Sequence, residues 1–181
     1  IVVVNIDNRL DPGFSAKHGL RGVAYISVDN EQGAYSAVSH LNRFITRPTA
    51  VAIIEGIRGA SNAEERKRGA LRAFGENSNA TVVAMETANW KIDEGYSVAA
   101  GLFRARPDIG ALFCANDMMA LGAVRYLEDN GRQDVLVAGY DALREALESI
   151  REGQLLATVD QQAALQGKLG VEYAARALRG E

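Results

Sequence analysis

A chain of 181 residues, 48% of them hydrophobic and 24% charged, is long enough to bury the core of one large domain or of two small lobes. Its 20 basic and 23 acidic residues are interspersed and give a net charge of −3, so no basic surface for nucleic acid is predicted. The single cysteine excludes an internal disulfide and a cysteine-rich metal site, and no apolar run approaches the ~20 residues that span a bilayer.

Short apolar runs alternate with amphipathic stretches along the whole chain. The apolar runs predict strands at 1–6, 23–28, 51–55, 81–85, 111–115, 135–139 and 156–159. The amphipathic stretches predict helices near 31–45, 62–76, 92–105, 117–129, 142–152 and 162–179. Because the predicted strands are continuously apolar, we expect an α/β fold with a doubly wound parallel sheet covered on both faces.

Local signals refine the element boundaries. The segment 8–22 contains a Pro-Gly turn signal and is expected to be a loop between two sheets or two parts of one sheet. The sequence SNAE at 61–64 predicts a capping box at a helix start. Asn130 and Gly131 predict the end of the helix that begins at Asn116 and Asp117.

Polar and aromatic residues gather at the predicted carboxyl ends of the strands, where open parallel sheets bind ligands. These residues are Asp7, Asp29, Asn30, Arg58, Asn89, Trp90, Asn116, Asp117, Tyr140, Asp141, Asp160 and Gln161. Turn and cap preferences explain many of the Asp and Asn residues but neither aromatic ring. Carboxylates and amides suit neighbouring hydroxyls, and flat rings suit the C–H faces of a sugar, so an uncharged, hydroxyl-rich ligand is favoured.

Signals for catalysis are poor. The chain lacks G-x-S-x-G, H-E-x-x-H and C-x-x-C, and it has neither glycine-rich phosphate-binding motif. His18 and His40 have no ligand spacing to another candidate, and Cys114 lies in an apolar strand, where a buried structural thiol is expected. Asp117 and Asp141 are a conceivable acid and base, but no nucleophile stands out. We therefore expect binding rather than catalysis, with no cofactor and no metal.

Five segments together resemble the ribose-type periplasmic sugar-binding proteins of the type I periplasmic binding protein superfamily. They are ISVDNEQGA (26–34), ERKRGALRAF (65–74), FCANDMMALGAVRYLEDNG (113–131), DVLVAGYDA (134–142) and IREGQLLATVDQ (150–161). The resemblance runs over 2–180 and implies two α/β lobes that close on a sugar. It implies a periplasmic, non-catalytic component of an ABC importer that binds a pentose or hexose. The implied partners are a membrane permease and, as a further candidate, a chemoreceptor, but not nucleic acid.

The resemblance also assigns roles in the first half of the chain. Asp7 corresponds to the first-lobe carboxylate that accepts from two sugar hydroxyls. Arg66 corresponds to a guanidinium that donates to sugar oxygens, although by sequence alone a solvated charge on a helix is the simpler interpretation. Trp90 falls where the family places a stacking aromatic residue, commonly Phe.

The second half of the chain supplies the remaining implied sugar-binding residues. Asn116 corresponds to a sugar-binding amide, and Asp117 beside it is interpreted as the N-cap of the following helix. Tyr140 and Asp141 correspond to an aromatic–carboxylate pair, with Asp141 binding hydroxyls. Gln161 corresponds to a sugar-binding amide at a crossover between the lobes.

Three positions depart from the ribose binders: Val28 replaces a small hydroxyl residue, Asn8 replaces a frequent Arg, and Trp90 is larger than Phe. These departures weaken the case for ribose itself but not for a monosaccharide. The chain also opens directly on a strand, so we expect it to be a piece of a longer protein. By the resemblance, 29–161 is a complete second lobe, and 1–28 with 162–181 are remnants of the first. If four hydrogen bonds are missing at ~1.5 kcal/mol each, a micromolar site weakens to ~10 mM or worse.

Two other classes of protein remain as alternatives. The effector-binding core of a lac-repressor-type regulator shares the implied fold, but the segment GQLLATVDQ (153–161) resembles the transporter branch. Such repressors more often carry P-x-L-T-T-V there, and IP-x-D where this chain has GRQD (131–134). The second alternative is an enzyme on a generic doubly wound fold, because a fold alone does not determine a function.

Overall fold

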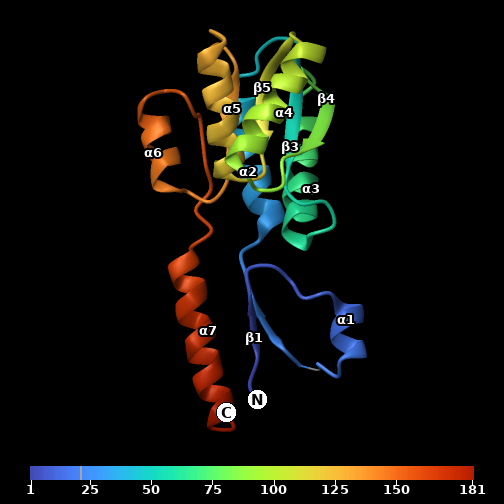
Figure 1. Ribbon diagram of the computed structural model, residues 1–181, viewed down its shortest axis with the longest axis vertical. Coiled ribbons are helices and arrows are strands. Elements are labelled where there is room, and N and C mark those ends of the chain that lie inside the picture. Colours follow the sequence, from blue (N-terminus) through green and yellow to red (C-terminus); the bar gives the residue numbers. More distant parts are fainter. Residues whose placement is uncertain (21) are drawn as a thin grey trace. The chain divides into compact units, whose positions relative to one another are not determined.

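The computed structural model describes residues 1–20 and 22–181; Arg21, inside the predicted loop 8–22, lies outside the described residues. The chain forms two compact units. The larger is Asn30–Gln161, and the smaller combines Ile1–Asp29 with Gln162–Glu181 (Figure 1). No helix among the described residues is long and apolar enough to cross a bilayer.

The larger unit is built on a 4-stranded sheet in the order β4-β3-β5-β6, with every neighbouring pair parallel. The strands are β3 (Thr49–Glu55), β4 (Ala80–Thr87), β5 (Ile109–Cys114) and β6 (Leu136–Ala138). In the register, Ile53 of β3 lies opposite Met85 of β4 on one side and Phe113 of β5 on the other. Ile53 and Phe113 are wholly buried, as expected for a central strand pair covered on both faces.

Helices connect these strands and cover both faces of the sheet. They are α2 (Asn30–Asn42), α3 (Ser61–Gly75), α4 (Ile92–Ala105), α5 (Asp117–Asp129) and α6 (Arg144–Arg151). The crossover through α3 leads from β3 to its neighbour β4. The crossovers through α4 and α5 run in the opposite direction along the sheet, from β4 to β5 and from β5 to β6. Right-handed crossovers therefore place α3 on one face and α4 and α5 on the opposite face. Accordingly α2 packs on α3, and α4 packs on α5 (Figure 1). The doubly wound α/β prediction is confirmed.

Glycines allow each helix pair to approach closely. A Cβ on Gly69 of α3 would lie 2.0 Å from the carbonyl oxygen of Glu31 in α2. A Cβ on Gly122 of α5 would lie 2.0 Å from the carbonyl oxygen of Ile92 in α4. Since real Cβ atoms do not approach backbone atoms this closely, both helix contacts depend on the missing side chain.

The smaller unit contains a 2-stranded parallel sheet of β1 (Val4–Ile6) and β2 (Ala24–Ile26). Helix α7 (Ala163–Leu178) packs on both strands, and Gly170 of α7 faces Ile6 so closely that a Cβ would lie 2.4 Å from its Cδ1. This unit also holds α1 (Pro12–Lys17).

Three local predictions are corrected by the structure. The predicted loop 8–22 contains α1, whose N-cap residue Asp11 accepts from the Phe14 N–H at 2.6 Å. The predicted capping box at 61–64 is wrong, because Ala60 is the N-cap and Glu64 instead accepts from the Gly59 N–H at 3.2 Å. The segment 156–159 forms a parallel bridge at Ala157 rather than a full strand.

Candidate functional site

The order of the strands makes the carboxyl ends of β3 and β5 the candidate ligand site. The crossovers that leave these adjacent strands run in opposite directions, which is the switch point where open α/β sheets bind ligands. Arg66 lies in α3, which follows β3, and Asn116 lies two residues after the end of β5 as the N-cap of α5. Asp141 follows β6. The segments that follow three different strands thus place polar side chains at the carboxyl end of the sheet.

Arg66 lies at the centre of a buried polar cluster. Its side chain is only 3% exposed, so the interpretation of Arg66 as a solvated helix charge is wrong. Its Nε donates to Asn30 Oδ1 at 2.9 Å and its Nη1 donates to the Ala115 carbonyl oxygen at 2.8 Å. A guanidinium this buried requires such partners to offset the loss of water.

Asp141 and Gln161 complete a ring of hydrogen bonds with Arg66. Arg66 Nη1 donates to Asp141 Oδ1 at 3.2 Å, and its Nη2 donates to Gln161 Oε1 at 3.3 Å. Gln161 Nε2 donates to the same Asp141 Oδ1 at 2.8 Å. Each of the three side chains is therefore oriented by the other two.

Two aromatic rings lie against the guanidinium. The Arg66 Cζ lies 3.8 Å from the centroid of the Tyr140 ring and 5.5 Å from that of Trp90. Tyr140 is wholly buried, whereas Trp90 is partly exposed. A Cβ on Gly56 would lie 2.0 Å from Trp90 Cη2, and one on Gly33 would lie 2.4 Å from Tyr140 Oη. Absent side chains therefore make room for both rings.

The backbone around the cluster is strained. Asn89, Trp90 and Asp141 have positive φ angles of 49°, 65° and 123°, which residues with a Cβ rarely adopt. Each such residue costs on the order of 1–3 kcal/mol, and such residues concentrate at functional sites. The Asn89 conformation is supported by its Nδ2, which donates to Glu94 Oε2 at 2.6 Å.

Comparison with known proteins identifies the family. The family model described as "Periplasmic binding protein domain" matches residues 1–181. The chain belongs to this family. It is 37% identical over 182 residues to the D-ribose/D-allose-binding protein of Pseudomonas aeruginosa, covering 100% of this chain and 56% of that protein. The chain thus spans little more than half the length of this relative, and the ribose-type resemblance is confirmed.

Solved structures agree with this assignment. An ABC transporter solute-binding protein from Burkholderia multivorans has a TM-score of 0.94 at 36% identity over 99% of this chain and 63% of its own. A periplasmic solute-binding protein from Actinobacillus succinogenes with bound D-allose has a TM-score of 0.92 at 37% identity over 98% of this chain and 63% of its own. The chain therefore has the type I periplasmic-binding-protein fold.

In this ribose-type chain, Asn116 and Asp117 have different roles from those predicted for helix capping. Asn116, not Asp117, is the N-cap of α5, and its Oδ1 accepts from the Met119 N–H at 3.0 Å. Asp117 is wholly buried, and its Oδ2 accepts from the Leu143 N–H at 2.9 Å. The capping prediction for Asp117 is thus wrong, while sugar binding through the amide group of Asn116 stays a prediction.

Asp7 belongs to the smaller unit. It has a φ of 70°, and its carbonyl oxygen accepts from Tyr25 Oη at 2.9 Å and from Ser27 Oγ at 2.8 Å. These bonds fix the backbone at the end of β1. Its predicted role as a sugar-binding carboxylate stays a prediction.

Asn30 is a functional candidate that the sequence analysis placed among the polar residues at the strand ends but gave no specific role. It is 1% exposed at the start of α2 and accepts from Arg66. Its place just after the predicted strand 23–28 was the only available signal. The Ala115 carbonyl, a main-chain group, had none. Cys114 is wholly buried, as predicted, and burial raises the pKa of its thiol.

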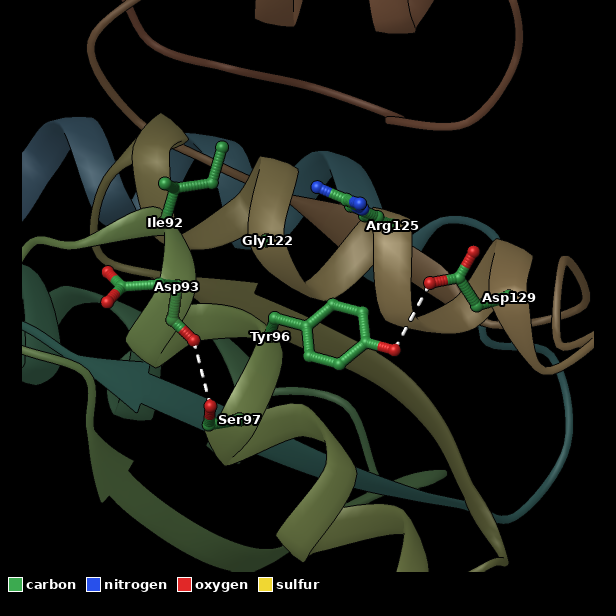
Figure 2. Close-up of a pocket in the computed structure, with 7 residues that line it drawn as sticks. All are labelled: Ile92, Asp93, Tyr96, Ser97, Gly122, Arg125 and Asp129. Atoms are coloured by element: carbon green, nitrogen blue, oxygen red, sulfur yellow. Dashed lines mark hydrogen bonds between the residues drawn. The ribbon is translucent and has the colours of Figure 1, made fainter.

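A groove lies between α4 and α5 and is lined by residues outside this cluster (Figure 2). It has a volume of about 390 Å³ and is lined by Ile92, Asp93, Tyr96, Ser97, Gly122, Arg125 and Asp129. Tyr96 Oη donates to Asp129 Oδ2 at 3.1 Å across it. None of the predicted sugar-binding residues lines this groove. Among the described residues, no group of His, Cys, Asp and Glu is arranged to hold a metal ion.

The buried carboxyl of Asp117 predicts a pH dependence of stability. Burial raises its pKa to about 6, against hydrogen bonds from Leu143 and Thr158 that lower it. Because an unfolded Asp has a pKa of about 4, the folded protein binds more protons between about pH 4 and pH 6. The contribution of Asp117 to stability therefore falls as the pH rises through this window.

Asp117→Asn removes this titration. Relative to the variant, the wild type is expected to gain about 2–3 kcal/mol of unfolding free energy when the pH falls from 7 to 4. Urea unfolding of both proteins at the two pH values measures the difference. A constant gap between them at both pH values would contradict the raised pKa.

Proposed function

We propose that this chain is the sugar-binding part of the periplasmic component of an ABC importer. In this proposal a monosaccharide, a pentose or a hexose, binds without chemical change in the cleft between two lobes. The ring formed by Arg66, Asp141 and Gln161 carries the proposal, since it is pre-arranged at the switch point of the sheet. A membrane permease is the proposed partner, and a chemoreceptor is a further one.

The charge of the cluster favours an uncharged ligand. The Arg66 guanidinium is balanced by the Asp141 carboxylate at 3.2 Å, so an anion would meet a negative group beside the positive one. Sugar hydroxyls both donate and accept, and they match a site that presents carboxylate, guanidinium and amide groups together. The partly exposed ring of Trp90 offers an apolar face for sugar C–H groups.

We also propose roles for the remaining predicted residues. The wholly buried ring of Tyr140 supports the guanidinium, while the amide of Asn116 and the carboxylate of Asp7 bind hydroxyls. Residues 29–161 form the second lobe, and 1–28 with 162–181 belong to the first, which supplies Asp7. The compact units Asn30–Gln161 and Ile1–Asp29 with Gln162–Glu181 support this division.

The relatives favour sugar transport over gene regulation or catalysis. None of the three proteins compared above is named as a repressor or an enzyme. One is a D-ribose/D-allose-binding protein, and another is a solute-binding protein with bound D-allose. D-ribose and D-allose are accordingly the first ligands to test.

Fluorescence of Trp90, the only tryptophan, tests the proposal. We expect a saturable change with D-allose or D-ribose at a dissociation constant on the order of 10 mM, reflecting the part of the site that this chain carries. The epimers D-altrose and D-arabinose are the matched controls and should give a much weaker response. A linear, unselective response to all four sugars would contradict sugar binding by this chain.

A further inference from the structure

We propose that Asp117 and Thr158 act as positioning residues: they clamp the turn 139–143 and thereby hold Asp141 in place for the sugar. Neither touches the ligand in this proposal. The inference deepens the proposed function and rests on it for its effect on affinity, but the clamp itself is testable without any sugar.

Asp117 holds the turn through both its backbone and its side chain. Its backbone N–H donates to the carbonyl oxygen of Tyr140 at 2.7 Å. Its Oδ2 accepts from the backbone N–H of Leu143 at 2.9 Å. One wholly buried residue at the start of α5 thus contacts the chain on both sides of Asp141.

Thr158 links the same carboxylate to the middle of the turn. Its hydroxyl donates to Asp117, with Oγ1 at 2.8 Å from Oδ1 and 3.0 Å from Oδ2. The same oxygen accepts from the backbone N–H of Ala142 at 3.1 Å. The Thr158 hydroxyl therefore links the Asp117 carboxylate to the backbone of Ala142, the residue next to Asp141.

The turn requires such a hold because its backbone is unfavourable. Asp141 and Ala142 have φ angles of 123° and 55°, and neither is a glycine. Position 139, at the start of the turn, has no room for a side chain, since a Cβ on Gly139 would lie 2.3 Å from Asp117 Oδ1. Without the clamp the turn is expected to relax toward ordinary φ values.

The position of Asp141 matters because its carboxylate orients two other side chains. It accepts from Arg66 at 3.2 Å and from Gln161 at 2.8 Å through the same Oδ1. A displacement of about 1 Å would break or lengthen both bonds beyond normal hydrogen-bond geometry. The clamp therefore acts on the whole ring of Arg66, Asp141 and Gln161.

Thr158→Val and Thr158→Ser test the clamp. Valine keeps the shape but removes the hydroxyl, whereas serine keeps the hydroxyl, so only valine should release the turn. Thr49→Val is the matched control, because the Thr49 hydroxyl donates to the Arg47 carbonyl oxygen at the start of β3, away from the cluster. Urea unfolding of each variant checks that it folds.

Hydrogen exchange of the Ala142 and Leu143 amides is the sugar-independent readout. We expect exchange at least ~10-fold faster in Thr158→Val than in the wild type, and within ~3-fold of the wild type in Thr158→Ser and Thr49→Val. Unchanged protection in Thr158→Val would overturn the clamp. This arm gives a result even if the chain binds no sugar, an outcome that would count against the proposed function alone.

Sugar affinity measured by Trp90 fluorescence is the second readout. For the sugar that binds the wild type, Thr158→Val should raise the dissociation constant by about 10-fold. The dissociation constant of Thr158→Ser should stay within ~3-fold of the wild-type value. Rescue by serine separates positioning from a loss of general stability. Equal affinity of the valine variant and the wild type would overturn the link between the clamp and the site.

Discussion

Replacing Arg66 with methionine is expected to destabilise the larger unit by about 3–5 kcal/mol and to abolish sugar binding. The substitution removes the guanidinium that lies 3.2 Å from Asp141, so a carboxylate whose side chain is only 15% exposed loses this ion pair. It also removes the donors to Asn30 and to the Ala115 carbonyl. Urea unfolding measures the stability, and sugar titration by Trp90 fluorescence measures the binding.

Arg68→Met is the matched control on the same helix. Arg68 is 55% exposed and pairs with Glu31 at 3.0 Å, so its loss is expected to cost at most about 1 kcal/mol. Arg66→Lys keeps the charge but not the planar fork of donors, so it should bind sugar more weakly than the wild type. If Arg66→Met unfolded at the same urea concentration as Arg68→Met, the expected contribution of the Arg66 hydrogen bonds to stability would be contradicted.

Replacing Gly69 with alanine is expected to lower the unfolding free energy by about 3 kcal/mol. The added Cβ would lie 2.0 Å from the Glu31 carbonyl oxygen and 2.9 Å from the Tyr35 nitrogen, so α2 and α3 must move apart. These two helices carry Asn30 and Arg66, so we also expect weaker sugar binding. Thermal unfolding should show a decrease in Tm of roughly 5–10 °C.

Gly101→Ala is the control for Gly69. Gly101 lies in α4, and a Cβ there would have no neighbour within 4 Å. Alanine favours a helix interior over glycine by up to about 1 kcal/mol, so this variant should be as stable as the wild type or more so. A Gly69→Ala protein that matched Gly101→Ala in Tm would contradict the close helix contact.

The sequence predicted the regular elements because their hydrophobic patterns are strong. The buried runs around Ile53 and Phe113 became adjacent parallel strands, and the predicted helix 92–105 matches α4. The short helix α1 was missed because Pro12 and Gly13 are a turn signal, although proline is also favoured at the first helical position. The Pro-Gly pair is therefore compatible with a turn and with a helix start, and the residues that follow it decide between the two.

The site was less predictable because its partners are far apart in the sequence. The charge pattern around Arg66 does not distinguish it from the exposed Arg68, and only the family resemblance singled it out. Its burial depends on partners such as Asp141 and Gln161, which are distant in the sequence. Asn116 and Asp117 are both good capping residues, and the choice between them depends on a turn more than twenty residues later. Such long-range contacts leave no periodic pattern.

The most direct test of the account is NMR of the side-chain N–H groups of the cluster during addition of D-allose and D-ribose. We expect the Arg66 Nε, Gln161 amide and Trp90 indole signals to shift with one of the sugars along a single saturating curve. The Gln154 amide, which donates to Glu128 at the far end of α5, should not shift. Saturating shifts confined to residues of the α4–α5 groove, with the cluster signals unchanged, would contradict the sugar site at Arg66.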